Sequence, residues 1–149
     1  MATALPRPFT SHDKQACLAL FDANVPRYFD AVEREEFDAF LTSKPHDYLV
    51  LENDGHIIAC GGVTWHQNDT IAGLAWGMVA PEHQGAGFGR YLLEARLELI
   101  RSRGAASKVV LSTSQHTAGF YKRFGFQVTS TTPDGFGPGL DEVEMKLPL

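Results

Sequence analysis

The residues best suited to do chemistry lie in one glycine-rich stretch in the middle of the chain. The stretch Gln84-Gly85-Ala86-Gly87-Phe88-Gly89-Arg90 has glycine at every second position. It follows an apolar, strand-like run and opens a helix-like run, and glycine in such a place lets the backbone approach a ligand closely. The free N–H groups and partial positive charge of the first helical turn favour an anion. The stretch therefore predicts a site for a phosphate or pyrophosphate group.

The spacing of these glycines indicates which class of phosphate-bearing ligand the site binds. A dinucleotide site needs G-x-G-x-x-G after the first strand of a βαβ unit, and a Walker A loop needs G-x-x-x-x-G-K-[ST]. Here the pattern is G-x-G-x-G in mid-chain, behind a predicted hairpin, and no lysine follows Gly89. A dinucleotide site, a nucleoside triphosphate site and a nucleotide-binding regulatory module all fail on this spacing.

Two motifs resemble those of one family, the GNAT superfamily of N-acyltransferases. Gln84, Gly87 and Gly89 match its acetyl-CoA pyrophosphate motif, [QR]-x-x-G-x-[GA]. Downstream, the run AGFYKRFGF from Ala118 to Phe126 resembles its second motif, a helix ending in Y-x-x-x-G-F. The resemblance extends from Arg7 to Leu147. It implies an acetyl-CoA-dependent N-acetyltransferase that joins acetyl-CoA as co-substrate with an amine-bearing acceptor.

The resemblance also implies roles for particular residues. Met78 and Val79 would offer backbone groups to the acetyl carbonyl and the pantetheine arm, on a strand that parts from its neighbour and in which Gly77 suits a bulge. The pyrophosphate would be wrapped by Gln84, Gly85, Ala86, Gly87, Phe88, Gly89 and Arg90. Tyr121 would stand near the cofactor sulfur as the catalytic residue. Ser114 would take the place of the asparagine that the family often has in its second motif.

Chemistry requires that the amine lose its proton, because only a neutral amine attacks a thioester. A lysine-like amine of pKa about 10.4 is mostly protonated at pH 7, so a base or desolvation is needed. The strand from Thr70 to Val79 contains no carboxylate, and the remaining candidates for the base are Glu33, Glu35, Glu36, His66 and Asp69. We therefore expect direct attack in a ternary complex, with a non-catalytic acyl-CoA-binding or sensing domain as the alternative.

The acceptor is not readable from the sequence. In the family it contacts the N-terminal helices and the last hairpin, which here are Val25 to Leu41, with Tyr28 and Phe29, and Thr131 to Asp141. Trp65 and Trp76 fit either an acceptor pocket or the core.

The elements that position these residues follow from periodicity and turn signals. Strands are expected at 7–9, 48–51, 56–65, 70–79, 109–111, 126–129 and 143–147, and helices at 10–25, 33–41, 90–103 and 116–124. The segment Pro133 to Gly139 is expected to be a loop. This order predicts one α/β domain over residues 1–149, a mixed, mostly antiparallel twisted sheet flanked by about four helices.

Composition limits the partners. The chain has 13 Lys and Arg against 18 Asp and Glu, a formal net charge of −5, which disfavours nucleic-acid binding. No run is long and apolar enough to span a membrane. Cys17 and Cys60 fit reduced thiols in a cytoplasmic protein. No metal is expected, since His83 and His116 lack ligand spacing, and a homodimer is left open.

Overall fold

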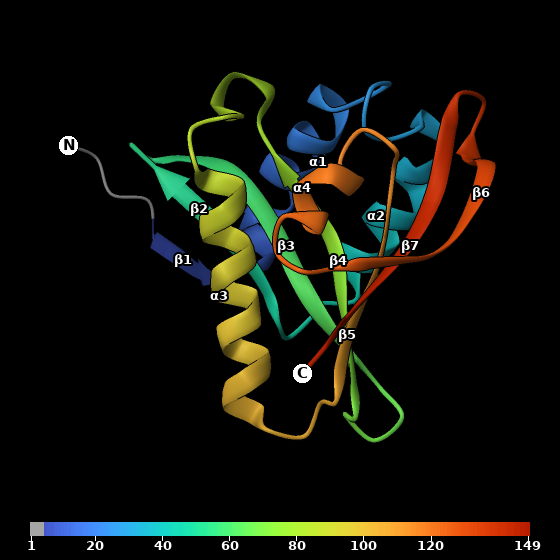
Figure 1. The fold of residues 1–149 in the computed structure, drawn as a ribbon. Coiled ribbons are helices and arrows are strands. Elements are labelled where there is room, and N and C mark those ends of the chain that lie inside the picture. Colours follow the sequence, from blue (N-terminus) through green and yellow to red (C-terminus); the bar gives the residue numbers. More distant parts are fainter. Residues whose placement is uncertain (1–4) are drawn as a thin grey trace.

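The computed structural model describes residues 5–149 as a single sheet with helices on both faces (Figure 1). The sheet has seven strands in the order β1-β2-β3-β4-β5-β7-β6. They are β1 (Leu5–Pro8), β2 (Tyr48–Asn53), β3 (His56–His66), β4 (Ile71–Val79), β5 (Lys108–Thr113), β6 (Gln127–Gly137) and β7 (Leu140–Pro148). The helices are α1 (Lys14–Ala23), α2 (Arg34–Thr42), α3 (Phe88–Arg103) and α4 (Ala118–Lys122). Only β4 and β5 pair in parallel, so the predicted mixed, mostly antiparallel sheet with four helices is confirmed.

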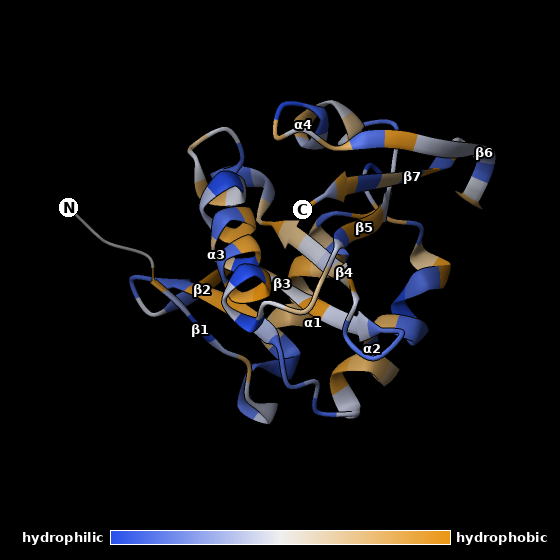
Figure 2. Ribbon diagram, turned by 60° about the horizontal axis from the view of Figure 1, so that its bottom comes forward, coloured by the Kyte–Doolittle hydropathy of each residue, from blue (hydrophilic) through white to orange (hydrophobic). Residues whose placement is uncertain are grey.

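Alternation along the central strands divides the molecule into layers. Neighbouring side chains of a strand point to opposite faces of its sheet. In β2, Val50 packs with Phe21 of α1 and Phe37 of α2, whereas Leu51 packs with Leu92 of α3. Figure 2 shows α3 on one side of β3 and β4 and the α1–α2 pair on the other. The sheet therefore separates an α1–α2 layer from an α3–α4 layer.

Strands β4 and β5 stay together for only part of their length. Their pairing runs from Ile71 with Lys108 to Gly73 with Val110, and the strands part beyond it. In the same half of β4, Trp76 and Gly77 together oppose Gly61 of β3, a bulge at the position expected from the sequence. Trp76 has a φ of 49° there. Parted strands and a bulge leave room within the sheet for a ligand.

The C-terminal hairpin departs from the sequence expectation. Turn signals predict a loop from Pro133 to Gly139, but β6 runs on to Gly137. The pairing of β6 with β7 skips from Thr132 to Gly137, and β6 lies at the edge of the sheet. Proline is tolerated at such edges and bulges because no ladder hydrogen bond needs its missing N–H. The segment is therefore an irregular extended strand.

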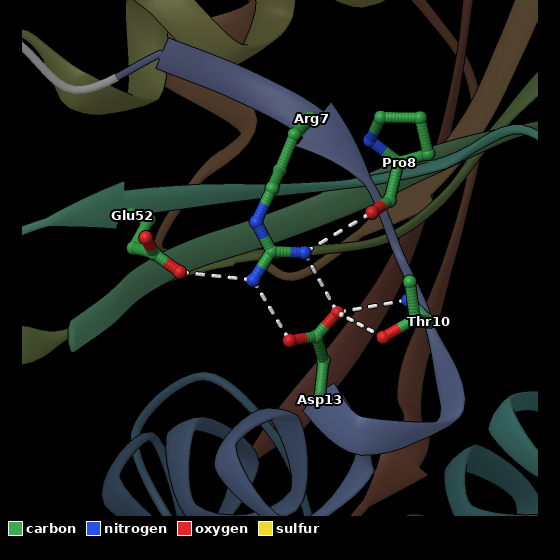
Figure 3. Close-up of polar contacts among 5 residues, drawn as sticks. All are labelled: Arg7, Pro8, Thr10, Asp13 and Glu52. Atoms are coloured by element: carbon green, nitrogen blue, oxygen red, sulfur yellow. Dashed lines mark hydrogen bonds and ion pairs between the residues drawn. The ribbon is translucent and has the colours of Figure 1, made fainter. Parts of the chain in front are cut away.

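A polar cluster holds the N-terminal strand to the domain (Figure 3). Both terminal nitrogens of Arg7 donate to the carboxylate of Asp13 at 2.9 Å, and Nη2 also donates to Glu52 at 2.9 Å. The backbone N–H of Thr10 donates to the same Asp13 carboxylate at 2.8 Å. The hydrogen bonds from Arg7 hold the pKa of Asp13 below its usual value. Asp13 thereby joins β1 to the turn that begins α1.

Candidate active site

A cavity of about 430 Å³ lies where β4 and β5 part. This volume is within the usual range for a small-molecule or cofactor site, roughly 300–1,000 Å³. Its walls are the second half of β4, residues 111–114 and segments of both helical layers. From the α3–α4 layer come Gly89, Leu92, Arg96, Thr117, Phe120 and Tyr121, and from the other face come Asn24, Tyr28, Phe29, Glu33 and Glu36. The cavity therefore reaches through the sheet and is lined from both of its faces.

The glycine-rich loop lies beside this cavity, at the N-terminus of α3. Gly85 and Gly87 have φ values of 79° and 92°, in the left-handed region that favours glycine. Gly87 is the N-cap of α3, and no side chain caps the helix there. The N–H groups of the first turn have no carbonyl of their own helix to bond. These features make the loop suited to a phosphate group.

The sequence-predicted binding residues divide into two groups. Six predicted site residues line the cavity: Met78, Val79, Gln84, Gly89, Ser114 and Tyr121. The others, Gly85, Ala86, Gly87, Phe88 and Arg90, lie in the adjoining loop and first helical turn and do not line it. The Phe88 ring packs in the core beside Leu92, and Arg90 pairs with Glu94 at 3.2 Å. Phe88 and Arg90 can thus serve a phosphate through their backbone N–H groups.

Gln84 connects the α1–α2 layer to the end of β4. Its side-chain nitrogen donates to Asn24 Oδ1 and to the carbonyl of Val79, both at 3.2 Å. Its oxygen accepts a hydrogen bond of 3.1 Å from the Tyr28 hydroxyl. These hydrogen bonds hold Gln84, the first residue of the glycine-rich loop, against the α1–α2 layer and the end of β4.

Tyr121 and Ser114 lie on the α4 side of the cavity. The half-buried Tyr121 ring packs edge-on against Phe120 and Phe126, with centroids 5.1 and 5.7 Å away. Ser114 is buried, and its hydroxyl oxygen accepts from the backbone N–H of His116 at 3.2 Å. Both side chains line the cavity on this side.

The next residue, Gln115, forms hydrogen bonds with the backbone of the β6–β7 hairpin. It donates to the carbonyl of Gly139 and accepts from the N–H of Asp141, each at 2.9 Å. Between the two neighbours, Ser114 is therefore the one that reaches the cavity.

The candidate bases differ in whether their side chains line the cavity. Glu33 and Glu36 line the cavity from α2 and the turn before it, while Glu35 lines only an adjoining groove. Asp69 lies 3.6 Å from Arg103 in an ion pair, and His66 contacts Thr64 at 2.9 Å, and neither lines the cavity. The candidate carboxylates that line the cavity are therefore those on the α2 side.

The surroundings of Glu33 raise the pKa of its carboxyl group. Burial raises its pKa above the usual value, and the nearby carboxylates of Glu36, Asp30 and Glu142 act in the same direction. One oxygen of Glu33 accepts a 2.9 Å hydrogen bond from the Asp30 N–H, which holds the side chain in place. A carboxylate whose pKa is raised toward neutrality is a better proton acceptor.

The two tryptophans have different roles. Trp76 lines the cavity and packs 4.9 Å from Phe37, centroid to centroid. Trp65 does not line it; its indole N–H donates to Asp47 at 2.7 Å, and Arg103 lies over its ring. Trp76 is thus the tryptophan that a substrate could touch.

One cavity residue that sequence reasoning missed is Arg96. It is 2% exposed and lies in the apolar stripe of α3, between Leu93 and Leu97. A charged residue within an otherwise apolar helical face was the available signal.

Two kinds of feature are absent from residues 5–149. No group of three or more His, Cys, Asp or Glu side chains in this range could hold a metal ion. None of the helices in it combines the length and apolarity that crossing a membrane requires.

Comparison with known proteins identifies the family. The model of the acetyltransferase (GNAT) domain matches residues 44–128. A Bacillus subtilis relative named "Putative [ribosomal protein bS18]-alanine N-acetyltransferase" is 32% identical over 98 residues, which are 63% of each chain. The match thus spans a little under two thirds of that relative. The chain belongs to the GNAT acetyltransferase family.

Solved structures of other proteins share the fold of this chain. Ard1 from Thermoplasma volcanium superposes with a TM-score of 0.82 at 18% identity, covering 98% of this chain and 97% of that one. N-acetylglutamate synthase from Neisseria gonorrhoeae, complexed with coenzyme A and N-acetyl-glutamate, gives a TM-score of 0.78 at 21% identity. That match covers all of this chain (100%) and 36% of the synthase. At these identities the likeness concerns the fold alone.

Proposed function

We propose that this protein transfers the acetyl group of acetyl-CoA to a primary amine by direct attack in a ternary complex. The observation that carries the proposal is the cavity between the parted strands β4 and β5, which adjoins an anion-binding loop and is reached by Tyr121 and Glu33. The residues fit the cofactor: the loop and first turn of α3 can take the pyrophosphate, and the gap between the strands can take the pantetheine arm.

The chemistry follows from this placement. The neutral amine attacks the thioester carbon, the C–N bond forms and the C–S bond breaks. A backbone N–H of β4 directed at the thioester oxygen would stabilise the negative charge that develops there. Tyr121 would orient the departing thiolate and partly protonate it; because tyrosine is about 1.5 pKa units weaker as an acid than a thiol, the contribution is modest.

Glu33 is the proposed proton acceptor, directly or through water. It enters the cavity from the face opposite α3, where the adjoining groove is lined by Glu33, Glu35, Glu36 and Glu142 and by no lysine or arginine of the described residues. Such a groove attracts a cationic amine, and transfer of the proton to Glu33 would make that amine a nucleophile.

The experiment uses the whole chain with acetyl-CoA and a panel of amines, and follows the release of free thiol. The panel includes a peptide N-terminus, a lysine-containing peptide, a polyamine, an aminoglycoside and an amino acid. Amine-dependent thiol release supports the proposal. Binding of acetyl-CoA without release for any amine would favour the non-catalytic acyl-CoA-binding domain.

A further inference from the structure

Arg96 carries a buried charge whose Nε and Nη1 find no acceptor within residues 5–149. The residue is 2% exposed and lines the cavity. Among residues 5–149, neither its Nε nor its Nη1 has a hydrogen-bond partner. Burying a charged group without a partner is costly, and buried polar groups in native proteins are nearly always paired. The described residues thus leave this guanidinium short of acceptors, and the cavity that Arg96 lines is the place from which a ligand can supply one.

Two glycines make the space in which the guanidinium lies. A Cβ atom at Gly77 would come within 3.1 Å of Arg96 Nη1 and Nη2, and one at Gly61 within 3.2 Å of Nη1. These glycines lie on neighbouring strands, at the bulge of β4. A Cβ atom at either position would press on the guanidinium, which would have to shift by a few tenths of an ångström. The backbone of β3 and β4 thus forms a fitted cradle for Arg96.

The position of Arg96 in the cavity indicates which substrate it meets. Gly89, Leu92 and Arg96 all line the cavity, and their spacing places them on one face of α3. At a rise of about 1.5 Å per residue, Arg96 lies roughly 10 Å along the helix from Gly89. The phosphate loop is therefore at one end of this face and Arg96 at the other.

The side of the sheet on which Arg96 lies indicates whether it meets the acyl donor or the acceptor amine. Arg96 projects from α3, whereas the carboxylates proposed to receive the amine enter from the α2 side. With the pyrophosphate at the start of α3 and the pantetheine arm in the gap between β4 and β5, as proposed above, the acyl end would lie near the bulge at Gly77, beside which the guanidinium lies.

We propose that Arg96 binds a carboxylate at the distal end of a longer acyl group, so that the protein accepts CoA thioesters of dicarboxylic acids as donors beside acetyl-CoA, with malonyl-CoA and succinyl-CoA as the probes. The inference rests on the proposed acyl transfer from CoA. A guanidinium donates charge-assisted hydrogen bonds to a carboxylate. The reaction is otherwise unchanged: the C–N bond forms, the C–S bond breaks, the thiolate takes a proton, and the distal carboxylate stays intact.

The test is calorimetric binding of matched acyl-CoA pairs to the whole chain. Malonyl-CoA is compared with propionyl-CoA, and succinyl-CoA with butyryl-CoA, so that in each pair a carboxylate replaces a terminal methyl group. We expect at least one carboxylated donor to bind about tenfold more tightly than its partner, as a charge-assisted hydrogen bond would give. Arg96→Met should abolish the preference within each pair. Arg101→Met, at an exposed arginine of the same helix, should retain it.

The alternatives to this proposal predict different outcomes in the binding experiment. Equal binding within both pairs in the wild-type protein overturns the proposal and leaves water as the acceptor, and this ratio decides even if Arg96→Met fails to fold. An Arg96-dependent preference for alanine over alaninamide in the CoA-saturated protein, without one among the acyl-CoA pairs, overturns the assignment to the donor. Failure of CoA itself to bind removes the proposed function together with this inference.

Discussion

The Tyr48 hydroxyl donates a 2.7 Å hydrogen bond to the carbonyl oxygen of Trp76, the residue at which β4 bulges. Tyr48 is fully buried, and burial raises its pKa well above the usual value, so it stays a protonated donor. Trp76 has a positive φ of 49°, a conformation that a bulky residue adopts only when its surroundings hold it there. The hydrogen bond from β2 thus supports the irregular part of the cavity wall.

Replacing Tyr48 by Phe should weaken both the fold and the site. Without the hydroxyl, the carbonyl of Trp76 loses a partner in a partly buried place, at a cost of about 1–3 kcal/mol in the free energy of unfolding. Urea denaturation measures this loss, and acetyl-CoA affinity should fall with it because the bulge is released. The control is Tyr91→Phe, at an exposed tyrosine of α3. Equal stability of the Tyr48→Phe and Tyr91→Phe proteins would contradict the supporting role.

Gly87→Val should abolish CoA binding. The residue has a φ of 92°, which a β-branched side chain resists, and its Cβ would project beside the phosphate loop. Gly104→Val is a matched control at the other end of α3, since Gly104 has a φ of 79° and both positions have open space around them. Both variants should lose stability by about 1–2 kcal/mol, but only the Gly87 variant should lose CoA in calorimetry. Normal CoA binding by a folded Gly87→Val protein would refute the loop assignment.

Gly89 differs from Gly87 in what it tolerates. Its backbone is helical, and a Cβ atom at this position would lie 3.6 Å from the ring of Phe120, an ordinary contact. Positive φ is therefore a reason for glycine at position 87 but not at position 89. Gly89→Ala should therefore fold normally, and any loss of CoA binding in it would point to contact with the cofactor.

Tyr121→Phe should lower kcat by roughly ten- to a hundredfold, the low end of ordinary general acid catalysis, and leave CoA affinity nearly unchanged. The physical reason is that only the hydroxyl is removed, while the ring keeps its packing against Phe120 and Phe126. Steady-state kinetics and CoA titration measure the two effects separately. If kcat does not change, Tyr121 serves only to pack α4 against the sheet.

Among the carboxylates, Glu33→Gln should reduce kcat/KM most, but by less than about a thousandfold, because water can partly replace a general base. Glu35→Gln and Glu36→Gln should do less, and Asp69→Asn should do least, because Asp69 is paired with Arg103 outside the cavity. The wild-type rate should rise with pH toward the pKa of the acceptor amine. A flat pH profile combined with a dead Asp69→Asn enzyme would show that the base is misplaced.

The Glu33→Gln change, which should lower kcat/KM, should raise the free energy of unfolding at neutral pH. Burial raises the pKa of Glu33 above 4.5 in the folded state, so its contribution to stability is full below pH 4.5 and is lost as the pH rises through the raised pKa. The neutral amide does not pass through this loss. Glu33→Gln should therefore be the more stable protein at pH 7, with an advantage that shrinks toward pH 4.5, as thermal unfolding across this range would measure.

The parts of the site that were predictable are those whose residue types decide local backbone geometry. The glycines at 85 and 87 and the apolar stripe of α3 locate the loop and its helix without any tertiary information. Arg96 and Glu33 were not predictable in the same way, because their burial depends on strands and helices far away in the chain. Pro133 illustrates a further limit: local turn signals predict a loop, but pairing with β7 at the sheet edge extends the strand.

The parting of β4 and β5 also bears on the order in which substrates arrive. The cavity is lined from both faces of the sheet, and in the proposed function the acyl carrier enters from the α3 side and the amine from the α2 side. Since neither molecule crosses the path of the other, the protein has no steric need to admit one before the other or to hold an acylated intermediate between visits. Saturation by one substrate should therefore leave the apparent Michaelis constant for the other almost untouched, and the spent thiol can depart by the route through which it came.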